Sequence, residues 1–156
     1  MAIKPIDFYD QLANCGIEFF TGVPDSLLKE FCLCIDAHVP QNNHIIAANE
    51  GNAIALAVGF FLAKKTLPIV YMQNSGLGNA INPLLSLCDP DVYAIPMVLM
   101  VGWRGEPGFM DEPHHGRAAQ DHCFNYIYFC FYYLYICTIY PSAPVCKLGN
   151  SAITFE

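Results

Sequence analysis

Short, uninterrupted apolar runs alternate with longer helical patterns from residue 5 to residue 102 of this 156-residue chain. Strands that are apolar along their whole length are covered on both faces, as parallel strands joined by helices are. The pattern predicts an α/β fold, a doubly wound parallel sheet with helices on both faces. Strands are expected at 17–20, 45–48, 69–72 and 95–101. Helices are expected from Pro5 to the Gly16 stop, after the N-cap Asp25, at 50–64 and at about 79–87.

The predicted helix at 50–64 differs from the others because Ala, Ile, Leu, Val and Phe occupy nearly all of its sides. A helix that is apolar all round is buried, either in the core of its own domain or in an interface. The sequence leaves both interpretations open for this helix.

The composition restricts the functions open to the chain. Its net charge is −7 and it has no run of Lys or Arg, so the electrostatic footprint of a nucleic-acid-binding protein is missing. The N-terminal residues lack the apolar segment of a secretory signal, so we expect a cytoplasmic protein whose eight cysteines stay reduced. Cys32 and Cys34 are spaced C-x-C without a second pair, so no zinc site is expected and no metal ligand is assigned.

The composition changes sharply near residue 122. Six tyrosines and three phenylalanines crowd residues 123–140, and only two charged residues follow position 121. The crowded segment contains no glycine and no strand-to-helix punctuation. We therefore expect an incomplete domain at 1–121, followed at 122–156 by an unrelated, aromatic-rich hydrophobic tail without helix or strand design.

Doubly wound folds bind ligands beyond the carboxyl ends of their strands. In this chain the loops at those ends are 21–26, 49–52, 73–79 and 102–117. Segment 21–26 has a plain explanation as a turn followed by a helix cap. Segment 102–117 carries Trp, Arg, acids and two His, which fits a mobile substrate loop, a metal site or a solvated loop without a role.

Glu50 opens an apolar helix directly after a buried strand. The helix N-terminus favours the charged carboxylate, whereas apolar burial favours the protonated acid. A glutamate in that setting can share a proton with a ligand. The alternative is an ordinary acid in the first turn of a helix.

The glycine-rich segment 73–79 reads QNSGLGN. It is not a dinucleotide fingerprint, because Ile81 stands at the third glycine position, and it lacks the Gly-Lys-Ser/Thr of a P-loop. It is not a nucleophile elbow, because Gln73 stands two residues before Ser75. Its glycines either let a ligand approach the backbone or form a turn without a ligand.

Taken together and in order, these segments resemble the phosphonopyruvate decarboxylase family, whose close relatives are the sulfopyruvate decarboxylases. The motifs that carry the resemblance are FFTGVPDS at 19–26, AANEG at 47–51, YMQNSGLGN at 71–79 and GWRGEPG at 102–108. The resemblance extends over nearly all of residues 3–117.

The resemblance implies the pyrimidine-binding domain of a thiamine-diphosphate-dependent carboxy-lyase. Glu50 stands where the family's cofactor-activating glutamate stands, sharing a proton with N1′ of the aminopyrimidine so that the thiazolium C2 loses its proton. The activated cofactor attacks a 2-oxo acid, and CO2 leaves with the thiazolium as electron sink. The expected reaction converts 3-phosphonopyruvate to phosphonoacetaldehyde and CO2, with sulfopyruvate as the alternative substrate.

The same resemblance assigns further residues to the cofactor and the substrate. Those expected around the cofactor are Gly22, Val23, Pro24, Asn74, Ser75 and Gly76. Arg104 is expected to contact the phosphonate, because a dianion is matched by the donors of a guanidinium fork. His114 and His115 are further substrate candidates.

The chain departs from the family pattern in one respect. The family holds the cofactor's diphosphate and Mg²⁺ in a second domain marked by Gly-Asp-Gly, and this tripeptide does not occur in the chain. We therefore expect the chain to supply only the pyrimidine half of a site, within a homo- or hetero-oligomer that contributes the diphosphate-binding domain.

Four origins for such a half remain open. It is a separate α-type subunit, as in two-subunit sulfopyruvate decarboxylases, or an inactive truncated product with a foreign tail, which we favour. A regulatory subunit that blocks the full-length enzyme is a third option. A tail anchor at 123–140 is a fourth, although its tyrosines fit membrane interfaces better than a membrane centre. An incomplete sheet also predicts poor solubility.

Overall fold

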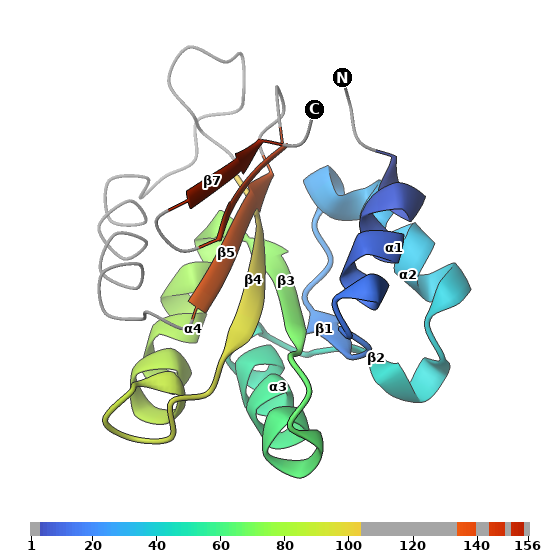
Figure 1. Ribbon diagram of the computed structural model, residues 1–156. Helices are drawn as coiled ribbons and strands as arrows, with labels where there is room; N and C mark the ends of the chain where they lie inside the picture. The colour runs from blue at the N-terminus through green and yellow to red at the C-terminus, as the bar shows by residue number, and fades with distance from the viewer. Residues whose placement is uncertain (1–3, 104–133, 140–143, 149–150, 155–156) are drawn as a thin grey trace.

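A single seven-stranded sheet runs through the part of the chain that the computed structural model describes, in the order β2-β1-β3-β4-β5-β6-β7 (Figure 1). The described residues are 4–103, with side chains, and the backbone of 134–139, 144–148 and 151–154. The strands are β1 (Phe20–Gly22), β2 (His44–Ile46), β3 (Ile69–Gln73), β4 (Met97–Gly102), β5 (Leu134–Ile139), β6 (Pro144–Leu148) and β7 (Ser151–Thr154). The helices are α1 (Pro5–Asn14), α2 (Lys29–His38), α3 (Glu50–Lys64) and α4 (Leu77–Pro83). Short helical turns complete the list: η1 (Ser26–Leu28), η2 (Gln41–Asn43), η3 (Asn74–Gly76) and η4 (Leu84–Cys88).

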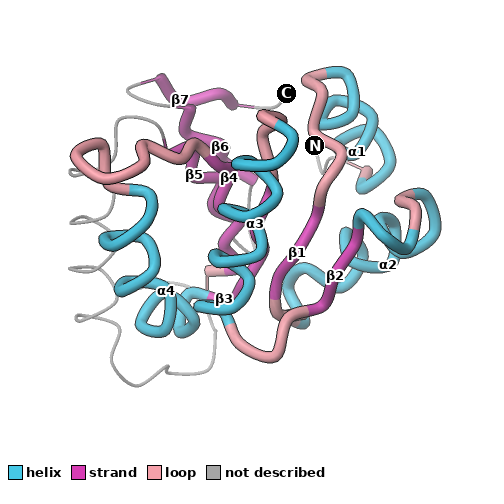
Figure 2. The backbone as a smooth tube through the Cα atoms, turned by 90° about the horizontal axis from the view of Figure 1, so that it is seen from below, coloured by secondary structure: helices cyan, strands magenta, loops and turns pink. Residues whose placement is uncertain are grey.

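Strands β2, β1, β3, β4 and β5 are parallel, and the predicted α/β class is confirmed. The chain passes outward from β1 through α2 to the neighbouring strand β2, then returns through α3 to β3 on the other side of β1. Because parallel crossovers are right-handed, this reversal puts the two helices on opposite faces of the sheet. Helices α1 and α2 cover one face, and α3 and α4 cover the other (Figure 2).

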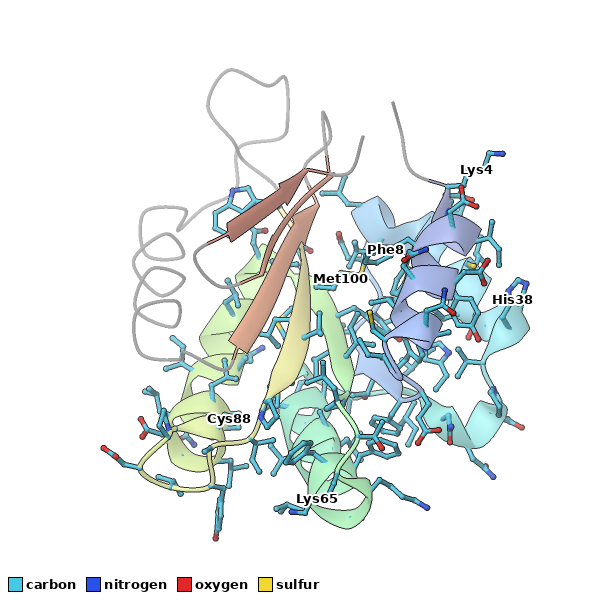
Figure 3. The ribbon with its side chains drawn as sticks, in the orientation of Figure 1. Lys4, Phe8, His38, Lys65, Cys88 and Met100 are labelled. Atoms are coloured by element: carbon cyan, nitrogen blue, oxygen red, sulfur yellow. The ribbon has the colours of Figure 1, made fainter. Side chains whose placement is uncertain are left out.

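Two apolar clusters fill the space between the helices and the sheet. Successive residues of a strand point to opposite faces, so Val70 and Met72 pack under α3 and α4, whereas Ile69 and Tyr71 pack under α1 and α2. Figure 3 shows Met100 of β4 and Phe8 on the α1 side, and Cys88 on the α4 side. The strands are therefore buried on both faces, which is why their sequences are continuous apolar runs.

The predicted and observed element bounds agree best for helices. The helix predicted at 50–64 is α3 with both ends as expected, and α1 ends shortly before Gly16, whose φ is +78°. The first strand was predicted too early: β1 extends to Gly22, because this residue pairs with β2 on one side and with β3 on the other. Two neighbouring strands keep the backbone extended through residues whose local sequence indicates a turn.

The expectation that residues 122–156 lack strand design is wrong. Strand β5 continues the parallel sheet beside β4, and β6 and β7 follow as antiparallel strands. The aromatic and β-branched composition of Leu134–Ile139 suits a strand that is apolar on both faces. Because this stretch is extended, a membrane-spanning helix over 123–140 does not match the described backbone. Among the described residues, no helix has the length and apolar character needed to cross a bilayer.

Candidate functional site

The carboxyl ends of β1 to β4 meet at one edge of the sheet, and the loops singled out from the sequence leave from that edge. Val23 and Pro24 follow β1, three residues separate the end of β2 from the start of α3, and η3 follows β3 directly. Trp103 follows β4. The sheet therefore brings together four segments that lie far apart in the sequence.

Glu50 is the first residue of α3, and its side chain is half-buried. The preceding residue, Asn49, caps the helix: its Oδ1 accepts a hydrogen bond of 2.9 Å from the backbone N–H of Asn52. The amide Nδ2 of Asn79, on α4, donates to Glu50 Oε2 at 2.8 Å. The cap fixes where the helix starts, and the amide fixes where the carboxylate points.

Gly76 gives the Glu50 side chain its place. A Cβ built on Gly76 would lie 2.4 Å from Cγ and 2.6 Å from Oε1 of Glu50, so any side chain there would displace the glutamate. Gly51 has a similar role one residue later, because its Cβ would lie 2.9 Å from the carbonyl oxygen of Asn79. Segments 49–52 and 73–79, predicted separately as site loops, are thus in direct contact.

The other residues of η3 differ in exposure. Asn74 is fully buried, whereas Ser75 is exposed to solvent beside it. Of the three residues assigned to this loop by resemblance, Gly76 contacts Glu50, and Ser75 is the one whose side chain a ligand could reach directly.

Gly22, Val23 and Pro24 lie at the carboxyl end of β1 and are held through the backbone. The Val23 N–H donates to the carbonyl oxygen of Tyr71 at 3.0 Å, and the Ala47 N–H donates to the carbonyl oxygen of Gly22 at 2.9 Å. Gly22 is buried, Val23 is half-buried and Pro24 is exposed. The segment is fixed to both neighbouring strands just before it leaves the sheet.

Two residues at this edge were not singled out as site residues by the sequence reasoning. Asp25 had been assigned only as a helix cap, and its Oδ2 does accept from the Leu27 N–H at 3.2 Å. The same oxygen would lie 2.4 Å from a Cβ on Gly102, so a nearly buried carboxylate reaches from the end of β1 to the end of β4. Trp103 is also buried there, at 4% exposure. An acid two residues after Val23 in the turn that follows β1 was the available signal.

Arg104, His114 and His115, the three substrate candidates, lie outside the described residues. Within the described residues, no group of three His, Cys, Asp or Glu side chains gathers as metal ligands would.

The chain is an α/β domain of the doubly wound class, whose ligand sites lie at the carboxyl edge of the sheet, where Glu50 is half-buried. The chain belongs to the thiamine pyrophosphate enzymes: the family described as "Thiamine pyrophosphate enzyme, N-terminal TPP binding domain" matches residues 7–122.

The curated relatives of the chain are decarboxylases. The phosphonopyruvate decarboxylase of Streptomyces viridochromogenes is 38% identical over 122 residues, covering 76% of this chain and 30% of that protein. The sulfopyruvate decarboxylase subunit alpha of Methanothermobacter thermautotrophicus is 37% identical over 115 residues, covering 72% of this chain and 67% of that subunit. The chain thus spans less than a third of the first relative and two thirds of the second. The predicted family resemblance is confirmed.

Solved structures share the fold. The benzoylformate decarboxylase of Polynucleobacter necessarius aligns with a TM-score of 0.57 at 23% identity, covering 72% of this chain and 20% of that chain. The 4-hydroxybenzoylformate decarboxylase of Rhodococcus jostii aligns with a TM-score of 0.59 at 18% identity, covering 88% of this chain and 30% of that chain. The alignments support the arrangement of strands and helices.

The residues at this edge fit the aminopyrimidine of thiamine diphosphate. A carboxylate has about four acceptor positions, and Asn79 occupies one of them. The absent Cβ of Gly76 leaves the glutamate a defined place at the carboxyl edge. A half-buried carboxylate held in this way can accept a proton or a hydrogen bond from a ring nitrogen.

Proposed function

We propose that this chain supplies the pyrimidine-binding half of a thiamine-diphosphate-dependent carboxy-lyase that decarboxylates a 2-oxo acid. The observation that carries the proposal is the Glu50 carboxylate, held by Asn79 and lying against Gly76 at the carboxyl edge of the sheet. A placed acid next to a backbone without side chains is what a planar ring with a basic nitrogen requires.

In this proposal Glu50 holds the proton that activates the cofactor. Asn79 keeps the carboxylate in one orientation, so little freedom is lost when the ring binds. The segment of Gly22, Val23 and Pro24 is assigned to one side of the ring, and the loop of Asn74, Ser75 and Gly76 to the other, where Ser75 offers the exposed side chain. When bound, thiamine diphosphate supplies the electron sink for the carbanion that CO2 leaves behind.

The proposed substrate is 3-phosphonopyruvate, and the products are phosphonoacetaldehyde and CO2. The support is the 38% identity to a phosphonopyruvate decarboxylase. Sulfopyruvate is the second candidate, because a sulfopyruvate decarboxylase subunit is almost as similar at 37%. Arg104, His114 and His115 are the proposed substrate contacts, since cationic and donor groups match either anion.

We further propose that a second domain or subunit holds the diphosphate and Mg²⁺, and that it docks on α3. The exposed stripe of this helix is uncharged and consists of Asn52, Ala55, Leu56, Gly59, Leu62 and Ala63. It begins within one turn of Glu50, so a partner seated on it lies beside the proposed site. The name "subunit alpha" of the second relative implies a companion subunit of this kind.

The extent of the domain belongs to the same proposal. We take residues 1–121 as the thiamine-diphosphate portion, which the family match at 7–122 supports. Residues 122–156 then add strands to the sheet without contributing to the site. An inactive or regulatory product remains the alternative if no partner restores activity.

The test combines the chain with the companion subunit of the Methanothermobacter thermautotrophicus enzyme and measures CO2 release with thiamine diphosphate and Mg²⁺. Phosphonopyruvate and sulfopyruvate are compared in parallel. We expect no turnover by the chain alone, and turnover by the mixture that falls by about 10² to 10⁴ in Glu50→Gln. Turnover by the isolated chain would contradict the half-site proposal, and no turnover by the mixture would favour the inactive product.

A further inference from the structure

Three polar side chains from three elements form a hydrogen-bonded chain on the α1/α2 face of the sheet, opposite the face that carries α3. His44 of β2 lies between the other two members. Its Nε2 is 2.8 Å from the Tyr71 hydroxyl of β3, and its Nδ1 is 2.8 Å from Oδ1 of Asp36 on α2. Tyr71 is fully buried, the His44 side chain is 5% exposed, and the Asp36 side chain is 55% exposed.

Tyr71 reaches His44 by crossing the strand between them. The sheet order is β2-β1-β3, so β1 separates the two residues. At the crossing point stands Gly22, whose Cβ would overlap the backbone carbonyl oxygen of Tyr71 and lie 2.6 Å from Cγ and Cδ2 of its ring. Any other residue at position 22 would displace both the backbone and the ring of Tyr71, and so its hydroxyl from His44. Gly22 therefore has a structural task on this face of the sheet that is separate from its proposed place near the cofactor.

The polar groups define the direction of each hydrogen bond. Asp36 offers only acceptors, so the proton between it and His44 resides on Nδ1. Burial raises the pKa of the Tyr71 hydroxyl, with smaller contributions from Cys32 and Asp36. The hydroxyl therefore keeps its proton, and when the His44 proton resides on Nδ1, the hydroxyl donates a hydrogen bond to Nε2. In this arrangement the Tyr71 hydroxyl donates to Nε2 and the Nδ1–H donates to Asp36.

These three hydrogen-bonded side chains lie directly beneath the strand ends that lead to the candidate site. The carbonyl oxygen of Tyr71 accepts from the Val23 N–H, and the carbonyl oxygen of Gly22, under the Tyr71 ring, accepts from the Ala47 N–H. Ala47 follows the last residue of β2 and precedes Glu50 by three positions. A short edge strand has few hydrogen bonds of its own, and β2 has only three residues.

We propose that Asp36, His44 and Tyr71 form a positioning chain that holds edge strand β2 in register and thereby sets where Glu50 begins α3. The three side chains do not touch the cofactor. Their role in cofactor binding rests on the proposed function. The two hydrogen bonds, and the proposed restraint on β2, do not depend on it. Asp36 is the solvent-exposed end of these three hydrogen-bonded residues, so a change at the surface can reach the buried Tyr71 through His44.

The first experiment measures the tautomer of His44 by ¹⁵N NMR of the full chain. We expect protonated Nδ1 and unprotonated Nε2. In Asp36→Asn, the amide can donate to Nδ1 as well as accept from it, so part of the population should move to the Nε2–H form. Asp36 is largely exposed, so this variant is expected to fold normally. A wild-type His44 protonated only at Nε2 would overturn the proposed hydrogen bonds to Asp36 and Tyr71.

The second experiment measures amide hydrogen exchange of Ala47 and Val23 in Tyr71→Phe, which loses only the hydroxyl. Because the partner nitrogen is left buried, we expect exchange at both amides to rise at least about tenfold. Tyr93→Phe is the matched control, since Tyr93 is 59% exposed and is not one of the three hydrogen-bonded residues. Unchanged exchange in Tyr71→Phe would overturn the hold on β2.

The third experiment separates this inference from the proposed function. In the complex with the companion subunit, Asp36→Asn and Tyr71→Phe should weaken thiamine diphosphate affinity at least about threefold, whereas Tyr93→Phe should not. If the affinity is unchanged although the tautomer and the exchange respond, the link to Glu50 is wrong. If no complex binds the cofactor, the proposed function fails. The first two experiments still show whether Asp36, His44 and Tyr71 hold β2 in register.

Discussion

At the scale of single residues, the absence of one carbon atom decides where the Glu50 carboxylate can lie. Gly76 accepts the side chain of Glu50 in the space that any other residue would fill with its Cβ. The sequence left two interpretations for the glycines of 73–79, the approach of a ligand or a turn without a ligand. The structure shows that the space beside one of them, Gly76, is occupied by the Glu50 side chain of the same protein.

The first prediction concerns Gly76→Ala. The added Cβ overlaps Cγ and Oε1 of Glu50, so the carboxylate must leave its hydrogen bond with Asn79. We expect cofactor-dependent CO2 release by the complex to fall by at least about tenfold, because a misplacement near 1 Å is costly in catalysis. Gly78→Ala is the control, since no atom lies within 4 Å of its Cβ. Equal activity of the two variants would contradict the assigned place of Glu50.

The second prediction concerns Cys88. Burial raises the pKa of its thiol from 9.0 to about 12. Because the thiolate is the reactive form, we expect alkylation at pH 8 about a thousandfold slower in the folded than in the unfolded chain. Since the folded pKa is raised, this group stabilises the fold below pH 9, and that contribution is lost as the pH rises towards 12. Peptide mapping after a timed pulse of iodoacetamide measures the rate, and fast labelling of the folded protein would contradict the burial.

At the scale of elements, the N-terminus of α3 joins local sequence to site geometry. Asn49 is in the extended conformation of an N-cap and holds the Asn52 N–H, while the next residue is Glu50. The cap therefore fixes the residue at which the helix starts, and so the direction of the glutamate.

The third prediction tests this cap. Asn49→Ala should lower the free energy of unfolding by about 1 kcal/mol in urea titrations, because the first-turn N–H loses its acceptor. Asn52→Ala, on the exposed side of the first turn, leaves the backbone N–H in place and should have a small or stabilising effect. A loss in Asn52→Ala equal to that in Asn49→Ala would show that the cap is not the cause.

Elements with strong local signals could be predicted from the sequence. Helix α3 was predicted with both ends from its long apolar run, and the N-cap Asn49 and the terminal Lys64 are signals that are local in sequence as well. Strand β1 was placed too early because its last two residues are extended only through pairing with β2 and β3. The strands after residue 133 were missed because an aromatic-rich segment without punctuation shows strand character only when a sheet edge is there to receive it.

The candidate site divides in the same way. Glu50 and the loop 73–79 could be singled out as site candidates from motifs that are local in sequence. The contacts of Asp25 with Gly102 and of Tyr71 with His44 could not, because they depend on which strands are neighbours in the sheet. No spacing along the chain encodes that order.

At the scale of the whole molecule, the exposed stripe of α3 is symmetric in sequence. Outward from Gly59, leucine stands three positions away in both directions and alanine four positions away. Two copies of α3 packed antiparallel across a twofold axis at Gly59 would therefore bring Leu56 of one against Leu62 of the other. Self-complementary surfaces of this kind form twofold dimers.

The fourth prediction follows from this symmetry. Without a partner, the chain should self-associate at micromolar concentrations, because one helix face is smaller than the interface of a tight dimer. Leu56→Glu, which puts a charge into the stripe, should shift the mass measured by light scattering towards the monomer. Leu33→Glu, at a leucine on α2 that is more exposed than Leu56 (53% against 38%), should leave the mass unchanged. A wild-type chain that stays monomeric would contradict the prediction.

A stripe that serves both a second copy and a companion subunit makes the two associations mutually exclusive. Assembly of the complex would then begin with dissociation of the self-paired chain. Its rate should rise with companion concentration only to a plateau, set by how fast the pair separates. Concentrating the chain before mixing would slow the appearance of activity, and dilution before mixing would speed it.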